Sequence, residues 1–232
     1  MKQIIRPGLF SVSVSADSRR GEFDFKNQVI VENEVPVDFV FIGDSITQIW
    51  ELNAYFNAPG QMVLNRGISG DTTEYVLKRF DADVVQLKPK HCVLMIGVND
   101  AWDMETDPWL RETLMTPEEV LARAVKNHRA IQEKAKLSGI DLWVCSVCPT
   151  NMDFTNHELQ RKQYIRALNA AIHQMCAENG FSYVDYYSLL VQEDGLSMRD
   201  GMTPEGLHPH VLGYNIMAEA LRKALASHSV TI

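Results

Sequence analysis

The sequence of 232 residues has little basic charge, no long apolar run and few cysteines. It contains 22 lysines and arginines against 30 aspartates and glutamates, which gives a formal net charge of −8. This acidic excess argues against nucleic acid or an anionic membrane as the main partner. No apolar run approaches the roughly 20 residues that a membrane-spanning helix needs. The first residues also lack a long apolar signal core, so we expect a cytoplasmic protein.

The four cysteines fit the same compartment. Cys145 and Cys148 form a C-x-x-C pair, but this pair lies in or just after a predicted strand and not at the start of a helix. Cys92 lies in another predicted strand, and Cys176 lies in a predicted helix. We therefore predict buried, reduced thiols rather than a redox pair.

The chain alternates short apolar runs with longer segments of helical spacing, and its length fits one α/β domain. The apolar runs predict strands at 39–42, 62–65, 92–96, 142–147 and 183–186. The spacing predicts helices at 46–56, 73–88, 117–138, 158–178 and 211–226. Five such units predict a three-layer α/β/α sandwich with a five-stranded parallel sheet and right-handed crossovers. The common strand order for such a sheet is the flavodoxin-like 2-1-3-4-5.

Residues 1–36 fit this pattern least well. Alternation in Phe10-Ser-Val-Ser-Val-Ser predicts a short edge strand, and the polar residues 17–22 predict a turn. Residues 29–31 are apolar and are expected to pack against the rest of the chain. We therefore predict an N-terminal extension over residues 1–36, packed on a domain formed by residues 37–232.

The first sign of chemistry lies at the end of the first predicted strand. Residues 39–42 are continuously apolar, as expected of a strand covered on both faces, and Gly43 and Asp44 then interrupt the run. Ser45 follows at the start of a predicted helix, where its hydroxyl can project from the carboxyl edge of the sheet. Serine in this place is commonly only a helix cap. To act as a nucleophile, Ser45 needs a base, an orienting acid and oxyanion donors.

Other segments supply residues of these kinds. His208 is the candidate base, and Glu205, three residues earlier, can hydrogen-bond the other imidazole nitrogen. The candidate oxyanion donors are the N–H groups of Ser45 and Gly70 and the side-chain amide of Asn99. In the order 2-1-3-4-5 the first and third strands are neighbours. Ser45 and Asn99 follow these two strands, so both are expected to line one crevice.

Together these segments resemble the SGNH (GDSL-type) hydrolases. The matching motifs, in family order, are Gly43-Asp44-Ser45, the loop 65–73, Gly97-Val98-Asn99-Asp100 and Glu205-Gly206-Leu207-His208-Pro209. The loop Asn-Arg-Gly-Ile-Ser-Gly-Asp-Thr-Thr is most similar to the platelet-activating-factor acetylhydrolase-like branch. The resemblance implies a flavodoxin-like α/β/α fold and hydrolysis of esters or thioesters without a metal or other cofactor. It implies the same roles for Ser45, Gly70, Asn99 and His208.

One position departs from the family pattern. The family usually has aspartate three residues before the histidine, whereas this chain has Glu205. Glutamate is one methylene longer but has the same charge and the same acceptors, so we expect Glu205 to keep the orienting role. Asp200 is the alternative acid if its loop folds back. A serine–histidine dyad supported by a backbone carbonyl is the third arrangement.

Further residues are candidates for contacts with a substrate. Asp44 adjoins the candidate nucleophile, and Trp102 and Trp109 follow the third strand closely. The two tryptophans either overhang the pocket or anchor a surface loop or an oligomer contact. His128 lies on an apolar helical face and is expected to be a satisfied core residue.

We therefore predict a serine esterase that hydrolyses carboxylic esters of small acyl groups, such as acetyl on a sugar or a lipid-like alcohol, through an acyl-enzyme. Its partner is a small-molecule ester. No metal is expected, because His208-Pro209-His210 lacks further ligands at a suitable spacing. Two alternatives stay open, an acyltransferase in which an alcohol replaces water and a non-catalytic ligand-binding module on the same fold. A homo-oligomer is also left open.

Overall fold

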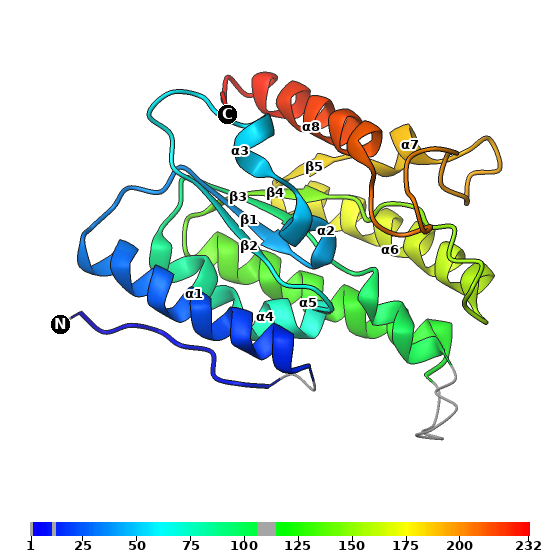
Figure 1. Ribbon diagram of the computed structural model, residues 1–232, viewed down its shortest axis with the longest axis horizontal. Coiled ribbons are helices and arrows are strands. Elements are labelled where there is room, and N and C mark those ends of the chain that lie inside the picture. The colour runs from blue at the N-terminus through cyan, green and yellow to red at the C-terminus, as the bar shows by residue number, and fades with distance from the viewer. Residues whose placement is uncertain (1, 11–12, 106–114) are drawn as a thin grey trace.

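A five-stranded parallel sheet forms the centre of the molecule (Figure 1). The computed structural model describes residues 2–10, 13–105 and 115–232. The strands are β1 (Phe39–Gly43), β2 (Val63–Gly67), β3 (His91–Met95), β4 (Asp141–Cys145) and β5 (Ser182–Val184). Their spatial order is β2-β1-β3-β4-β5, with every neighbouring pair parallel. The predicted sheet and its strand order are confirmed.

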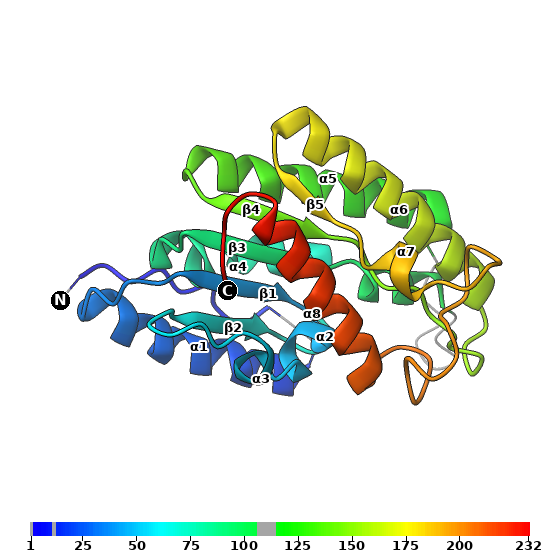
Figure 2. The ribbon, with the colours of Figure 1, turned by 90° about the horizontal axis from the view of Figure 1, so that it is seen from above.

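Helices cover both faces of this sheet (Figures 1 and 2). One layer contains α1 (Val14–Glu32), α4 (Thr73–Asp83), α5 (Pro117–Leu137) and α6 (Glu158–Asn179). The opposite layer contains α8 (Val211–Ala226) and the short α3 (Leu52–Tyr55). The remaining short elements are α2 (Ser45–Ile49), α7 (Tyr187–Leu190) and the 3₁₀ turns η1 (Val85–Leu87) and η2 (Asn99–Met104). Because both faces are covered, β1 is buried along its whole length.

Local sequence signals explain several helix boundaries. Thr116 caps α5: its Oγ1 accepts from the Glu119 N–H at 3.2 Å, and the Glu119 carboxylate accepts from the Thr116 N–H at 2.9 Å. Pro117 occupies the first position of the helix, where its missing N–H costs nothing. At the end of α6, Gly180 takes a left-handed conformation with φ of +77°. These signals predict the start of α5 and the end of α6 well.

The N-terminal segment differs from its prediction. Residues 14–32 form α1, not an edge strand followed by a turn, and Phe10 lies outside any strand; residues 11–12 lie outside the described residues. The buried positions of α1 are spaced as on one helical face, and two of the four are polar: Ala16, Arg20, Phe23 and Asn27. A helix that buries an arginine and an asparagine has no clear apolar period, so hydrophobic patterning could not reveal it.

The segment after β1 also differs from its prediction. One helix was expected over residues 46–56, but the chain forms α2 and α3 with Trp50 extended between them (φ −69°, ψ 114°). Trp50 is 3% exposed, and its ring stacks on that of Tyr214 with centroids 5.2 Å apart. Burial of this indole against α8 accounts for the break.

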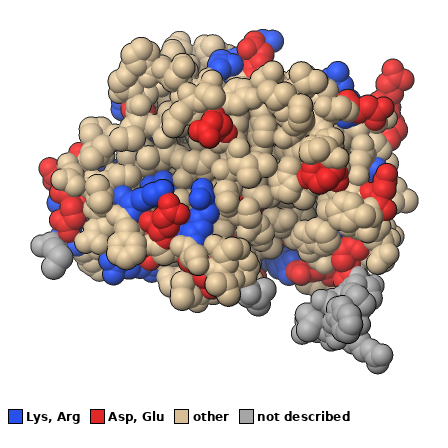
Figure 3. Space-filling view, viewed as in Figure 1, with Lys and Arg blue, Asp and Glu red and all other residues tan. Residues whose placement is uncertain are grey.

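The four cysteines are free and buried, as predicted. Burial raises the pKa of the Cys145 thiol to about 12, which keeps it protonated and unreactive at neutral pH. Acidic and basic side chains are interspersed over the face shown in Figure 3. Within the described ranges, the structure contains no helix that is both long enough and apolar enough to cross a membrane.

Candidate active site

Ser45 is the first residue of α2, at the carboxyl end of β1. The preceding Gly43 is required by space, because a Cβ at this position would collide with the Met95 carbonyl oxygen and the Thr47 side chain. The cap of α2 is Asp44, whose carboxylate accepts from the Ile46 N–H at 2.9 Å. Ser45 is therefore not the capping residue, and its hydroxyl is available for other contacts.

His208 meets Ser45 from a distant part of the chain. Its Nε2 lies 2.8 Å from the Ser45 Oγ. The turn that precedes His208 depends on Gly206. This glycine has φ of +92° and lies so close to the Asn151 carbonyl that a side chain would not fit. The Asn151 N–H donates to the Gly206 carbonyl at 2.7 Å and fastens this turn to the loop after β4. The structure thus brings together the predicted nucleophile and the predicted base.

Glu205 contacts the other ring nitrogen of His208. Its carboxylate lies in a short contact with His208 Nδ1 and also accepts from the His208 N–H at 2.8 Å. Partial burial raises the pKa of Glu205, but the hydrogen bonds from the His208 backbone and imidazole outweigh burial, so the net pKa lies below the ordinary value. Asp200, the alternative acid, instead accepts from Gln192 Nε2 at 3.2 Å.

Thr203 supports the glutamate and was missed by the sequence analysis. Its Oγ1 lies 3.3 Å from the second carboxylate oxygen of Glu205 and accepts from the Gly206 N–H at 3.0 Å. The signal that would have found it is a hydroxyl residue two positions before the acid in a tight turn.

The candidate oxyanion donors follow the carboxyl ends of β1 and of the two strands that pair with it, β2 and β3. Asn99 begins η2 after β3, the strand that pairs with β1. Its Nδ2 donates to the Asp71 carbonyl at 3.0 Å, which fixes the amide and leaves its second hydrogen for another acceptor. Gly70 takes φ of +81° in the turn before α4. Neither the Gly70 nor the Ser45 N–H donates a hydrogen bond to any residue in the described ranges.

A buried ionic cluster holds the loop between β2 and α4 in place. Arg79 donates to Asp71 at 2.6 Å, to Asp83 at 2.8 Å and to the Gly43 carbonyl at 3.0 Å. Burial alone would lower the pKa of Arg79, but the carboxylates of Asp71 and Asp83 raise it above the ordinary value. Because Arg79 contacts both Gly43 and Asp71, it links the turn before Ser45 to the loop that contains Gly70.

The predicted substrate contacts lie in different environments. Asp44 is 1% exposed, and burial raises its pKa to about 7, although the bond from Ile46 opposes this shift. Its observed contact is the helix cap. Trp102 is 43% exposed on η2, with the Arg161 guanidinium 4.9 Å from its ring centroid. Trp109 lies outside the described residues.

His128 is a core residue, as predicted, but only one of its two ring nitrogens is satisfied, because Nδ1 is buried with no hydrogen-bond partner among the described residues. It is fully buried on α5, with Nε2 3.1 Å from the Ile96 carbonyl, and burial lowers its pKa to about 4. Within the described residues, no three His, Cys, Asp or Glu side chains are grouped so that they could hold a metal ion.

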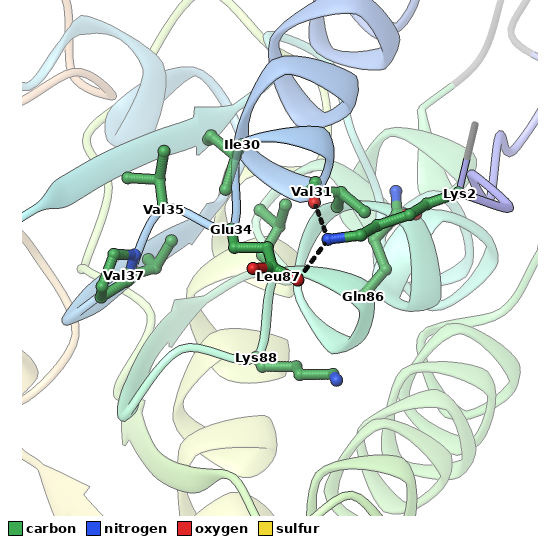
Figure 4. Close-up of a pocket in the computed structure, with 10 residues that line it drawn as sticks. Lys2, Ile30, Val31, Glu34, Val35, Val37, Gln86, Leu87 and Lys88 are labelled. Atoms are coloured by element: carbon green, nitrogen blue, oxygen red, sulfur yellow. Dashed lines mark hydrogen bonds and ion pairs between the residues drawn. The ribbon is translucent and has the colours of Figure 1, made fainter.

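A hollow of about 460 Å³ lies at the opposite end of the sheet from Ser45, where α1 ends and β1 begins (Figure 4). Lys2 bridges part of it, donating to the Val31 carbonyl at 3.1 Å and to Glu34 at 2.7 Å. Among the described residues that line it, none is a candidate catalytic residue. The candidate catalytic residues therefore lie at the carboxyl edge of the sheet and not in this hollow.

Comparison with known proteins identifies the family of this chain. The model of the GDSL-like lipase/acylhydrolase family matches residues 41–216. An acetylxylan esterase from Geobacillus stearothermophilus is 25% identical over 177 residues, which cover 75% of this chain and 76% of the relative. A GDSL-like lipase from Bacteroides thetaiotaomicron superposes with a TM-score of 0.74 at 26% identity, covering 90% of this chain and 97% of that one. A structure from Streptococcus pneumoniae, provisionally described as a platelet activating factor, shares the fold with a TM-score of 0.70 at 21% identity, covering 90% and 93%.

Proposed function

Because this chain belongs to the GDSL-like lipase/acylhydrolase family and is a serine ester hydrolase, we propose that Ser45 is its nucleophile, His208 its general base and Glu205 the acid that orients the base. The observation that carries this proposal is the 2.8 Å contact between Ser45 Oγ and His208 Nε2, with Glu205 on the other ring nitrogen. Residues 163 positions apart in the chain meet here in the geometry that serine activation requires.

In the proposed mechanism, Ser45 Oγ attacks the ester carbonyl while His208 Nε2 takes the hydroxyl proton. The carboxylate of Glu205 accepts from Nδ1–H, which selects the tautomer and stabilises the imidazolium. His208 then gives its proton to the leaving alcohol as the acyl-enzyme forms. Water, deprotonated by the same imidazole, attacks the acyl-enzyme and releases the carboxylic acid and free Ser45.

The negative charge that develops on the carbonyl oxygen needs donors already in place. We propose the N–H groups of Ser45 and Gly70 and the Nδ2 of Asn99 for this role. The two backbone groups have no protein acceptor within the described ranges, and the amide of Asn99 is held by Asp71 with one hydrogen unused. Donors fixed before the reaction stabilise the tetrahedral intermediate without reorganising.

Replacing Asn99 by alanine is expected to lower kcat by about 10²–10³-fold and to leave KM nearly unchanged, because the lost donor acts mainly in the transition state. Steady-state kinetics on a chromogenic acetyl ester measure both constants. Asn169→Ala is the matched control, since Asn169 is 6% exposed against 7% for Asn99 and also donates to a backbone carbonyl, that of Val147. An unchanged kcat for Asn99→Ala would remove this residue from the oxyanion site.

We propose small acyl groups, acetyl in particular, as the preferred substrates, carried on a sugar or a lipid-like alcohol. The similarity to an acetylxylan esterase supports acetyl on a sugar. We propose that the half-exposed ring of Trp102, on the turn that begins with Asn99, contacts the alcohol or the acyl group of the substrate. We propose that the buried Asp44, next to Ser45, contributes to the shape of the substrate site.

An acyl-chain series of p-nitrophenyl esters tests this choice. We expect kcat/KM to fall steadily from acetyl to octanoyl, and acetylated xylooligosaccharides to release acetate. A kcat/KM that rises with chain length would instead assign the site to long-chain lipids. A rapid burst of p-nitrophenol equal to the enzyme concentration reports the acyl-enzyme, and its absence together with no turnover would favour the binding module. Ester formation on added alcohols would favour the acyltransferase.

We also propose that residues 37–232 form the hydrolase domain, that residues 1–36 are an extension packed on it, and that the protein acts in the cytoplasm. The four free cysteines support a reducing compartment.

A further inference from the structure

The family match begins at residue 41, so α1 lies entirely outside it. Even so, α1 reaches the active-site end of the molecule. In both views α1 runs beside α4, and its first turns lie at the end of the sheet where β1 leads into α2 (Figures 1 and 2). The part of α1 nearest the site is therefore the half that contains Arg19 and Arg20.

This half of α1 contacts the oxyanion loop, residues 67–71, at three points. Arg19 Nε donates to the Gly67 carbonyl at 2.7 Å. Ala16 and Phe23 form a separate buried apolar cluster with Ile68. Arg20 Nη2 donates to an Asp71 carboxylate oxygen at 2.5 Å. The helix α1 thus contacts the loop at its first residue, at Ile68 and at its last residue.

Arg20 is the deepest of these contacts. Its side chain is 1% exposed, and that of Asp71 is fully buried. The guanidinium also donates to Asp17 at 2.8 Å and lies 4.1 Å from the centroid of the Phe10 ring. The second carboxylate oxygen of Asp71 accepts from Arg79 at 2.6 Å, so each oxygen has its own arginine.

The same aspartate connects Arg20 to the proposed oxyanion donors. The Asp71 carbonyl accepts from Asn99 Nδ2 at 3.0 Å, and the residue before Asp71 is Gly70. A shift of Asp71 would therefore move both Gly70 and Asn99. Removing Arg20 leaves one oxygen of the buried Asp71 carboxylate without its donor, and this loss favours such a shift.

We infer that α1 is a positioning element of the active site and that Arg20 is its positioning residue, acting through Asp71 on Gly70 and Asn99. This inference rests on the proposed function, because it assumes that Gly70 and Asn99 bind the oxyanion. Arg20 itself touches no reacting atom. Its effect is to hold the donors where the charge develops, and small displacements of such groups are costly.

Arg20→Met in the full-length chain tests the inference. We expect kcat to fall by about 10- to 100-fold with KM nearly unchanged, and Arg20→Lys to recover part of the loss by restoring the charge. In an Asn99→Ala background the same Arg20→Met change should cost less than it does in the wild-type protein, because one of its two routes of action, the one through Asn99, is already lost. Thermal unfolding of each variant shows whether it is folded at the assay temperature.

Asn27→Ala is the matched control. Asn27 lies seven residues further along the same buried face of α1. It donates to Asp83 at 2.8 Å and to the Ala82 carbonyl at 3.0 Å, and it accepts from Arg66 at 2.9 and 3.0 Å. In the part of the chain that the structure describes, it has no hydrogen bond to residues 67–71. A purely structural role for α1 predicts that Asn27→Ala and Arg20→Met lower kcat equally, and this outcome would overturn the inference. An unchanged kcat for Arg20→Met, together with a lowered kcat for Asn99→Ala, would overturn the inference about Arg20 but not the proposed function. An unchanged kcat for Asn99→Ala would instead remove Asn99 from the oxyanion site and so refute that part of the proposed function.

Discussion

Ser45→Ala is expected to lower kcat on a chromogenic acetyl ester by about 10⁴–10⁶-fold, the largest loss of any single substitution in this chain. The reason is chemical, because alanine has no group that can form the acyl-enzyme. Ser45 Oγ is the atom within 2.8 Å of His208 Nε2, so no neighbouring hydroxyl replaces it without moving the imidazole. The remaining rate should come from the oxyanion donors and substrate binding alone.

Covalent labelling separates this role from a general effect on structure. A fluorophosphonate should modify the wild-type protein once and leave Ser45→Ala unmodified, as measured by intact mass. Ser69→Ala is the control, because Ser69 is an exposed serine in the oxyanion loop whose backbone N–H, which alanine keeps, donates to Gln48 at 2.7 Å. Labelling of Ser45→Ala at full stoichiometry would show that another residue is the nucleophile.

The sheet and the strand-end residues could be predicted from the sequence because parallel strands leave a simple signal. A strand covered on both faces is a continuous apolar run, and β1 is buried at all five positions. The carboxyl ends of adjacent parallel strands lie at one edge, so Ser45 and Asn99 had to be close once the order was known. Their proximity follows from topology alone.

The N-terminal helix could not be predicted in this way. Its buried face includes Arg20 and Asn27, which hydropathy patterns assign to solvent. Both side chains are buried because they have hydrogen-bond partners on other elements. Arg20 donates to Asp71, and Asn27 donates to Asp83 and accepts from Arg66. A side chain whose burial depends on a partner more than 35 residues away leaves no local signal.

The acid of the site illustrates a second limit. The spacing of Glu205 and His208 favoured Glu205 as the orienting acid, but it left Asp200 open as the alternative. The tight turn at Gly206 supports Glu205, since it places this carboxylate against both the imidazole and the backbone N–H of His208. Turn geometry of this kind depends on Asn151, which lies on a different loop.

Glu205→Gln is expected to lower kcat by about 10³–10⁴-fold, while Asp200→Asn should change it by less than about 3-fold. Glutamine keeps the length and one acceptor but loses the charge that stabilises the imidazolium. Because the pKa of Glu205 lies below the ordinary value, its carboxylate is ionised in the wild-type protein throughout the neutral range. The loss on substitution should therefore be constant from about pH 6 to 9 and should not diminish at the alkaline end.

Asp200→Asn is a matched control because it removes the same charge five residues away, from a carboxylate whose observed partner is Gln192. Glu205→Asp adds a second comparison, since it restores the charge on the shorter side chain. The Glu205 carboxylate also accepts from the His208 N–H at 2.8 Å, so the shorter acid must give up this bond or the imidazole contact, and we expect only partial recovery. A greater loss in Asp200→Asn than in Glu205→Gln would transfer the orienting role to Asp200. Small losses in both would leave a serine–histidine dyad as the working arrangement.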